Sequence, residues 1–180
     1  MRLWTNQSNL SISELETTGV LRANWQRYPP NDGFRLAYAW MCTRMEKSNL
    51  PCKGHAPVWA WHSCGGFGKP PALRDARALL SDLELENGVQ TIELDCPDDC
   101  ALLSMYGVWN TILDAFMDRS SDTVIGKRLE RQLFKIRPEK IGEFDAVQAS
   151  LPLIKKEWVL DIRPLKLPVG SFDFDPDAEI

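Results

Sequence analysis

The chain has few residues that could build a disulfide framework or hold a metal ion. It contains two histidines and five cysteines in 180 residues. The cysteines are odd in number and show no framework spacing; they are Cys42, Cys52, Cys64, Cys96 and Cys100. Such a set argues against a disulfide-stapled secreted scaffold and is typical of a reducing compartment, so we expect a cytoplasmic protein.

Long apolar runs and a strong positive charge are also missing. No segment approaches eighteen consecutive apolar residues, and residues 1–6 lack the apolar core of a signal peptide. We therefore expect no membrane partner. The net charge of −4 and the pI near 5.3 exclude a globally basic surface, so contact with nucleic acid would have to be local.

Familiar catalytic motifs are absent too. The glycine-rich stretch 65–68 lacks the Lys-Ser/Thr pair and the strand–helix context of a phosphate-binding loop, and there is no nucleophile elbow. One cluster resembles a metal site, because Cys52, His55, His62 and Cys64 fall within thirteen residues. Zinc accepts such ligands, although structural sites usually use tighter cysteine pairs. We keep zinc as an alternative to a loop that holds these residues by chance.

What the chain does have is enough apolar sequence for one core. Apolar residues make up 44% of it, which excludes a disordered chain, and 180 residues suit one domain. We predict a single globular domain over residues 1–168 and an acidic C-terminal tail over 169–180. Hydrophobic periodicity predicts an α+β fold with about six strands and four helices. The helices are expected over 13–18, 33–47, 107–117 and 124–136; the strands over 2–5, 58–61, 77–85, 89–94, 101–104, 146–151 and 158–165.

Three details of this prediction bear on function. The Asn-Gly pair at 87–88 predicts a hairpin between the strands 77–85 and 89–94. The helix over 33–47 is apolar on two faces, so it is either sandwiched in the core or forms the wall of a groove. In the strand over 58–61, the period of two puts Trp59 and Trp61 on one face.

The seven tryptophans exceed what packing alone requires. Trp4, Trp40, Trp59 and Trp61 belong to elements whose ends could converge, and flat aromatic walls suit nicotinamide, adenine or unstacked bases. Core packing is the alternative for each of them. A second feature is a basic run that could contact the phosphates of nucleic acid, with a solvated helix face as the alternative. Its residues are Lys127, Arg128, Arg131 and Lys135.

The order of short motifs resembles a bacterial domain family of unknown function. Members open with Arg/Leu-Trp-Thr-x-Gln and continue with a helix ending in Thr-Gly-Val, an Ala-Tyr-x-Trp-Met helix, a Pro-x-Trp-Ala-Trp strand and a Leu-Leu-Ser segment before a Trp-containing helix. In this chain the motifs begin at Arg2, Thr18, Ala37, Pro57 and Leu102, and the helix contains Trp109. The resemblance runs from residue 2 to about 163 and implies no activity.

A more distant resemblance does imply an activity. The segment Trp4-Thr5-Asn6-Gln7-Ser8-Asn9-Leu10, followed by Gly19-Val20-Leu21, is similar to the first strand and helix of DarT-like ADP-ribosyltransferases. The segment 148–159 is similar to the last strands of that fold. The resemblance implies two small β-sheets with about four packed helices, NAD as co-substrate, a macromolecular acceptor such as nucleic acid, and a toxin or phage-defence setting with an antitoxin or other protein partner.

The same resemblance assigns roles to individual residues. Arg2 would contact the pyrophosphate, Thr5 and Asn9 the nicotinamide-side ribose or amide, and Trp4 would help to bind the cofactor. Tyr38 and Trp61 would stack on it. Gln148 falls where these transferases hold a catalytic glutamate; it can bind the ribose but carries no negative charge, so Glu157 or Glu93 would have to assist.

Two functions therefore follow from the sequence. The first is NAD-dependent ADP-ribosyl transfer to a macromolecule, with Gln148 and Glu157 as catalytic residues. The alternative is a non-catalytic binding module whose tryptophan-lined groove holds a nucleotide, a peptide or a partner protein. The missing carboxylate at Gln148 favours the alternative.

Overall fold

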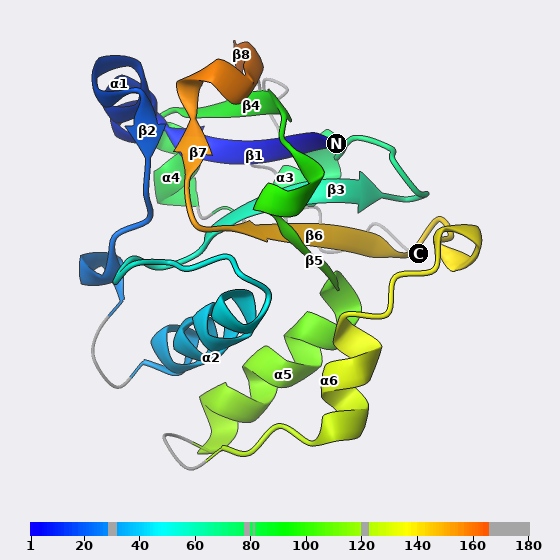
Figure 1. Ribbon diagram of the computed structural model, residues 1–180. Helices are drawn as coiled ribbons and strands as arrows, with labels where there is room; N and C mark the ends of the chain where they lie inside the picture. Colours follow the sequence, from blue (N-terminus) through cyan, green and yellow to red (C-terminus); the bar gives the residue numbers. More distant parts are fainter. Residues whose placement is uncertain (29–31, 78–79, 81, 120–122, 166–180) are drawn as a thin grey trace, which may run out of the picture.

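The computed structural model describes residues 1–28, 32–77, 80, 82–119 and 123–165 (Figure 1). The predicted acidic tail, 169–180, lies outside the described residues. Eight strands are described: β1 Arg2–Ser8, β2 Val20–Leu21, β3 Val58–Cys64, β4 Val89–Asp95, β5 Leu102–Met105, β6 Ala146–Leu151, β7 Ile154–Lys155 and β8 Val159–Pro164. The helices are α1 Asn9–Thr18, α2 Gly33–Lys47, α3 Leu73–Arg77, α4 Asp82–Glu86, α5 Tyr106–Arg119 and α6 Lys127–Leu133.

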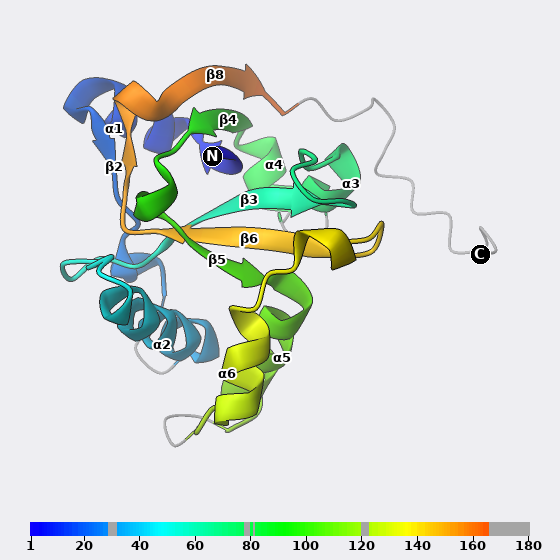
Figure 2. The ribbon, with the colours of Figure 1, turned by 45° about the vertical axis from the view of Figure 1, so that its right-hand side comes forward.

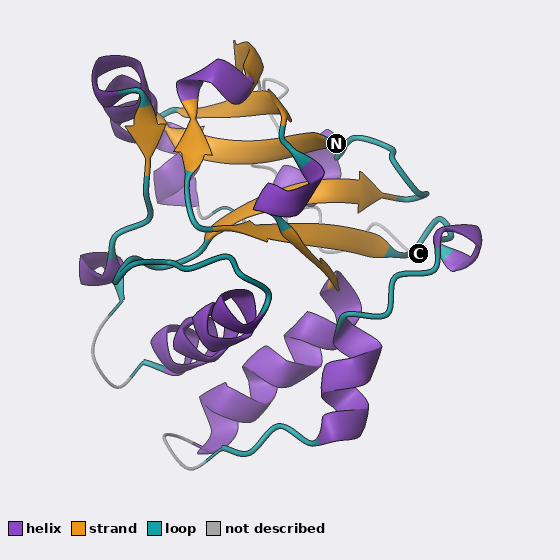
Figure 3. Ribbon diagram, viewed as in Figure 1, coloured by secondary structure: helices purple, strands orange, loops and turns teal. Residues whose placement is uncertain are grey.

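The strands form two antiparallel sheets, which confirms the predicted single α+β domain with two sheets. Six of them build the larger sheet in the order β5-β6-β3-β1-β4-β8, and β2 pairs with β7 in the smaller one. Helices α2, α5 and α6 lie together on one side of the molecule, against the end of the sheet that holds β5 and β6 (Figures 1 and 2). Helix α1 lies beside the small sheet at the other end (Figure 3).

Strand periodicity divides the core into two clusters. Val58 and Ala60 of β3 belong to a cluster with α1 and the small sheet. Trp59, between them in sequence, packs against the second cluster, which α2, α5 and α6 supply. Because neighbouring side chains of a strand point to opposite faces, the larger sheet separates the two clusters. The functional features described below lie on the side of α2 and α5.

Helix α2 has the predicted bounds, and Asp32 caps its N-terminus. The Asp32 side chain accepts a hydrogen bond from the Phe34 N–H at 2.7 Å, which satisfies a free donor of the first turn. Each of the two alternatives given for this helix, core and groove wall, holds for a part of it. Ala37, Met41 and Met45 are fully buried in the core, whereas residues near the start of the helix line a pocket.

The strand predicted over 77–85 is wrong. Residues 82–86 form α4, and 73–77 form α3; residues 78, 79 and 81 lie outside the described part. The alternation Leu-Glu-Leu-Glu has a period of two, but this segment consists mainly of strong helix formers and has no β-branched residue. The predicted hairpin is wrong for the same reason, because Gly88, at φ +84°, follows the end of α4 in the left-handed conformation favoured after helices.

The remaining differences concern element ends and short strands. Helix α1 starts at Asn9 instead of 13, because the Ser8 hydroxyl accepts from the Ser11 N–H and caps it there. It ends before Gly19, as predicted. Helix α6 covers 127–133 and is shorter than the predicted 124–136. The two-residue strands β2 and β7 are too short to give a periodic signal. In the described chain no helix combines the length and the apolar character needed to cross a bilayer.

Candidate functional site

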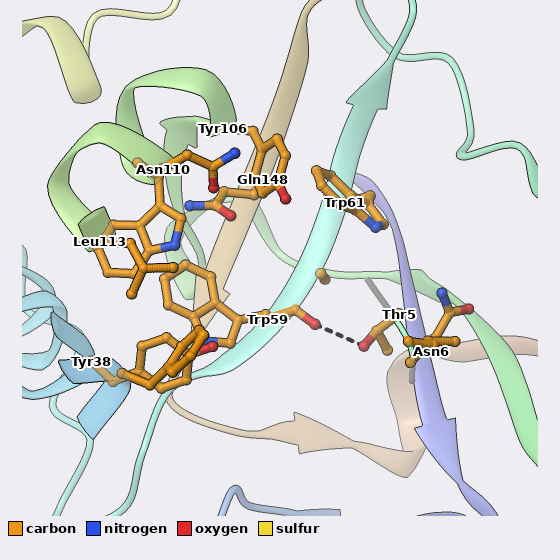
Figure 4. A pocket seen from close by; sticks show the side chains of 13 residues that line it. Thr5, Asn6, Tyr38, Trp59, Trp61, Tyr106, Asn110, Leu113 and Gln148 are labelled. Atoms are coloured by element: carbon orange, nitrogen blue, oxygen red, sulfur yellow. Dashed lines mark hydrogen bonds between the residues drawn. The ribbon is translucent and has the colours of Figure 1, made fainter. Parts of the chain in front are cut away.

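A cavity of about 440 Å³ lies between the larger sheet and the helices α2 and α5. This volume is within the range of small-ligand sites. Its lining comes from β1, β3, β6, α2 and α5, together with Leu80. Figure 4 shows it from close by. We call it the aromatic pocket, because most of its large lining side chains are aromatic rings.

Two groups of rings form the walls of the aromatic pocket. In the first group, the Trp59 centroid lies 5.1 Å from that of Tyr38 and 4.9 Å from that of Trp109. In the second group, Trp61 and Tyr106 meet edge to face at 4.9 Å. The rings of each group hold one another in place through these contacts. The pocket therefore has preformed, flat walls.

The part of the pocket lined by the larger sheet lies where the pairing of β1 with β3 ends. Their register consists of one pair, Trp4 with Trp61. Further along, a side chain makes the connection, because Thr5 Oγ1 donates to the Trp59 carbonyl oxygen at 2.7 Å and accepts from Gln7 Nε2 at 2.8 Å. Thr5 is buried, and its hydroxyl is used by these two bonds. Its role is to hold the two strands at the pocket.

Gln148 is the main polar group of the pocket. It lies on β6, paired with Trp61 of β3 on one side and with Ser104 of β5 on the other. Figure 4 shows its amide between Tyr106 and Asn110 on one side and Trp59 on the other. The side chain is 5% exposed, and within the described chain no partner bonds its Nε2. A buried donor without a partner costs about 1–3 kcal/mol.

Three further buried polar atoms near Gln148 also lack a hydrogen-bond partner among the described residues. In the described part of the protein, Trp59 Nε1, Ser104 Oγ and Ser150 Oγ are buried and have no hydrogen-bond partner. Ser104 pairs with Gln148 across the sheet, and Ser150 pairs with Trp59, so all four residues are neighbours on one face. Unpaired polar groups are rare in protein interiors. Two of the four residues, Trp59 and Gln148, line the cavity, whereas Ser104 and Ser150 do not.

The pocket carries no formal charge. Among the described residues that line it, none is acidic or basic. Burial raises the pKa of the Tyr38 phenol well above its usual range, and the neighbouring Tyr28 adds to this effect. Tyr38 therefore stays protonated at physiological pH. The pocket suits an uncharged, planar group that can accept or donate hydrogen bonds.

Half of the site residues predicted from the sequence meet in this pocket. Thr5, Tyr38, Trp61 and Gln148 all line it, although they come from four different elements. They join segments from the two ends of the chain. Of the predicted tryptophan groove, Trp59 and Trp61 are present in the lining. Trp40 instead packs under the Arg44 guanidinium, 4.7 Å from the ring centroid.

The other predicted site residues lie elsewhere. Arg2 Nη1 donates to Glu93 Oε1 at 2.9 Å on the surface of the sheet. Trp4 is buried but is not part of the pocket lining. Asn9 begins α1 and accepts from Gln90 Nε2 at 2.9 Å. Glu157 follows the small sheet, is exposed, and pairs with Lys155 at 3.1 Å. None of these four lines the pocket.

Helix α5 supplies pocket residues that the sequence reasoning assigned to the core or passed over. Tyr106, Trp109, Asn110 and Leu113 fall at i, i+3, i+4 and i+7, so they share one face of the helix. This pattern is typical of a core-facing helix. The signal that could have identified the pocket is Asn110, a polar residue within an otherwise apolar face.

The zinc alternative finds no site in the structure. Within the described chain no three His, Cys, Asp or Glu side chains are grouped so that they could hold a metal ion. Cys52 is buried and contacts the Met45 sulfur at 3.7 Å. His62 packs on Phe67, and its Nδ1 lies 2.7 Å from Ser63 Oγ. The four soft residues therefore do not act as one ligand set.

Fold and pocket together define an α+β domain with an aromatic cavity beside its larger sheet. The family model of a domain of unknown function, DUF3841, matches residues 2–125, and the chain belongs to this family. The match confirms the resemblance inferred from the motifs over that range. It includes the pocket walls from α2, β3 and α5, whereas Gln148 and α6 follow it in the chain. No curated protein and no solved structure matches the chain.

Proposed function

We propose that the domain binds the planar, uncharged ring of a nucleotide or of nicotinamide in the aromatic pocket. The observation that carries this proposal is the Gln148 amide, which is buried in an aromatic cavity with its Nε2 unpaired in the described chain. A carbonyl or ring nitrogen of the ligand would accept from Nε2. This bond would remove the desolvation cost of a buried donor that has no partner.

The walls support the same class of ligand. Tyr38, Trp59 and Trp109 present rings on one side, and Trp61 and Tyr106 do so on the other. A base stacked on an aromatic side chain gains about 1–3 kcal/mol. A charged ligand group would be poorly placed among these rings, because no described lining residue could neutralise it.

NAD fits this pocket in part. Its adenine ring is uncharged and suits the walls, and its carboxamide suits Gln148. The nicotinamide ring of oxidised NAD carries a positive charge, so it falls outside the uncharged class of ring that the proposal names. The diphosphate would find no cation among the described lining residues, since Arg2 pairs with Glu93 outside the pocket. Ring recognition is therefore the core of the proposal, with the phosphates of a nucleotide placed toward solvent.

Calorimetric titration with nicotinamide, adenosine and NAD tests the proposal. We expect heat with at least one ring compound and none with ribose 5-phosphate, which lacks the ring. The Gln148→Met variant keeps the bulk of the side chain but loses the donor, so its affinity should fall by roughly tenfold or more. Gln132→Met, which changes an exposed glutamine on α6, is the matched control and should bind as the wild type does. Unchanged affinity in Gln148→Met would refute the assignment.

ADP-ribosyl transfer from NAD to a macromolecule remains a second candidate. It is favoured by one specific observation: Thr5 and Gln148, which the resemblance places at the NAD site, line the same pocket. Gln148 could bond a ribose hydroxyl, but Glu157 is exposed and lies apart from it. A toxin role, with a protein antitoxin as partner, belongs to this second candidate.

Turnover of NAD distinguishes the transferase from the binding module. A transferase releases nicotinamide from NAD and arrests growth when it is expressed without its antitoxin, and Gln148→Ala should relieve both effects. A binding module holds NAD or its ring without releasing nicotinamide. Release measured by chromatography, with Gln148→Ala as the control, decides between them.

A further inference from the structure

A second concave surface is formed by helix α2 and the segment that includes α6, and it shares no lining residue with the aromatic pocket. It is an open groove of about 1090 Å³ between the C-terminal turn of α2 and the segment 125–135, which includes α6. Arg44 and Lys47 come from α2; Lys127, Arg131 and Lys135 come from the segment. We call it the basic groove. Nothing in the proposed ring site uses it.

The groove concentrates positive charge on a chain that is negative overall. Five lining residues are cationic and one, Glu130, is anionic, while the whole chain has a net charge of −4. Glu130 is already paired, because Arg44 Nη2 donates to its Oε2 at 3.2 Å and Arg44 Nε lies 3.0 Å from its Oε1. In the described chain, Lys47, Lys127, Arg131 and Lys135 form no ion pair, and all four are exposed.

The Arg44–Glu130 pair also fixes the shape of the groove. It links the last turns of α2 to α6, and the Arg44 guanidinium rests on the Trp40 ring. Both partners are largely buried, with side chains 16% and 29% exposed. The ion pair therefore holds together the two elements whose backbones carry the remaining cations of the groove.

Two apolar side chains lie between the cations. Phe134 and Ile125 line the groove and pack against the core cluster of α2 and α5. A fixed aromatic ring among lysines and arginines is the arrangement by which proteins hold single-stranded nucleic acid, with a base on the ring and phosphates on the cations. An acidic peptide would use the cations but has no planar base for the ring.

We propose that the basic groove binds a short stretch of single-stranded nucleic acid through its phosphates. Lys127 and Arg131 on α6 and Lys135 just after it contact successive phosphates, Lys47 contacts the strand from α2, and Phe134 supports a base. Helix α6 has seven residues and is about 10 Å long, so the contact spans only a few nucleotides. Binding is independent of sequence, because the contacts address the backbone and the face of any base.

The experiment compares two triple variants by fluorescence anisotropy with a labelled single-stranded DNA of mixed sequence. Lys127→Gln, Arg131→Gln and Lys135→Gln together remove three cations from the groove. Arg128→Gln, Arg137→Gln and Lys140→Gln remove three cations from the same basic segment, but none of these residues lines the groove. We expect the first variant to bind about 20-fold or more weakly and the second to lose less than about threefold.

Several results would overturn the proposal. One is an equal loss of affinity for single-stranded DNA in both triple variants. Another is no binding of this DNA by the wild type up to about 100 µM protein in low salt. The third is that a poly-glutamate peptide, or duplex DNA of the same length, binds as tightly as the single strand. If the groove triple variant unfolds early in a thermal melt, the pair Lys47→Gln and Lys135→Gln replaces it, with Arg128→Gln and Lys140→Gln as control. Gln148→Met should bind the strand normally, so failure here and failure of the ring site are distinguishable.

Discussion

The aromatic pocket and the basic groove share helix α2 and use it in opposite ways. The described pocket lining consists of uncharged residues, mostly buried or half-buried, and several of these also pack the core. The groove takes mostly exposed, charged residues from α2 and the segment around α6. The comparison shows that a ring site has to be built into the interior, where water is excluded, whereas a phosphate site can be added to the surface of a finished fold.

The largest expected difference is in stability. Trp109→Ala in the pocket should lower the free energy of unfolding by about 3–5 kcal/mol, because Trp109 is 3% exposed and supports both the pocket wall and the core. Lys135→Ala in the groove should cost less than about 0.5 kcal/mol, since its side chain is exposed. Urea denaturation measures both. Similar costs would remove the distinction between an interior site and a surface site.

The second difference is in the response to salt. Raising the salt from about 50 to 200 mM should weaken binding of single-stranded DNA by about 20- to 50-fold if three or four phosphates are contacted. Binding of nicotinamide or adenosine should change by less than about twofold, because none of the described lining residues is charged and hydrophobic contact is not screened. Titrations at the two salt concentrations test this. A salt-sensitive pocket would indicate that charged groups outside its lining take part.

The third difference concerns Gln148 alone. Gln148→Met should raise the free energy of unfolding by about 1 kcal/mol while it weakens ring binding, because it removes a buried donor that has no partner in the described chain. For a domain of this size the melting temperature should rise by about 2–4 °C. A residue that lowers the stability of the fold, as Gln148 is expected to do, is typical of a binding site. A clear loss of stability would mean that the amide has a structural role.

The smallest expected effect is a pH dependence at the pocket's own strand. Burial lowers the pKa of His62, which follows Trp61 in β3, and the N-terminal ammonium lowers it further. The unfolded chain therefore binds this proton more readily, so stability is complete above the ordinary pKa of about 6.5 and declines as the pH falls below it. Denaturation at pH 7.5 and 5.0 should show the decline in the wild type, and His62→Asn should reduce it. An equal decline in both proteins would assign it to another group.

The sequence predicted most of what depends on local pattern. The bounds of α2, the opposite directions of Trp59 and Ala60, and the strand at 146–151 all follow from periodicity and capping. Leu83 to Glu86 misled the prediction, because a period of two outweighed the helix propensity of these residues. Local pattern also could not show that β1 and β6 flank β3, since that neighbourhood depends on pairing between distant segments.

The candidate site was predictable only in part for the same reason. Tyr38, Trp61 and Gln148 were identified through a resemblance, and the fold brings them together. Trp109 and Asn110 were missed because an apolar helix face looks the same whether it meets the core or a cavity. The sequence also did not show which residues complete the basic groove with those at 127–135, because Arg44 and Lys47 lie 80 or more residues away in the chain.

The most direct measurement follows the side-chain amide of Gln148 by NMR while nicotinamide or adenosine is added. Its signal is assigned by its absence from the spectrum of Gln148→Met. We predict that the amide signal shifts on saturation and that its protons gain protection from exchange, while the Gln132 amide stays unchanged. Binding that leaves the Gln148 amide unshifted, or no binding of either ring compound, would contradict the account.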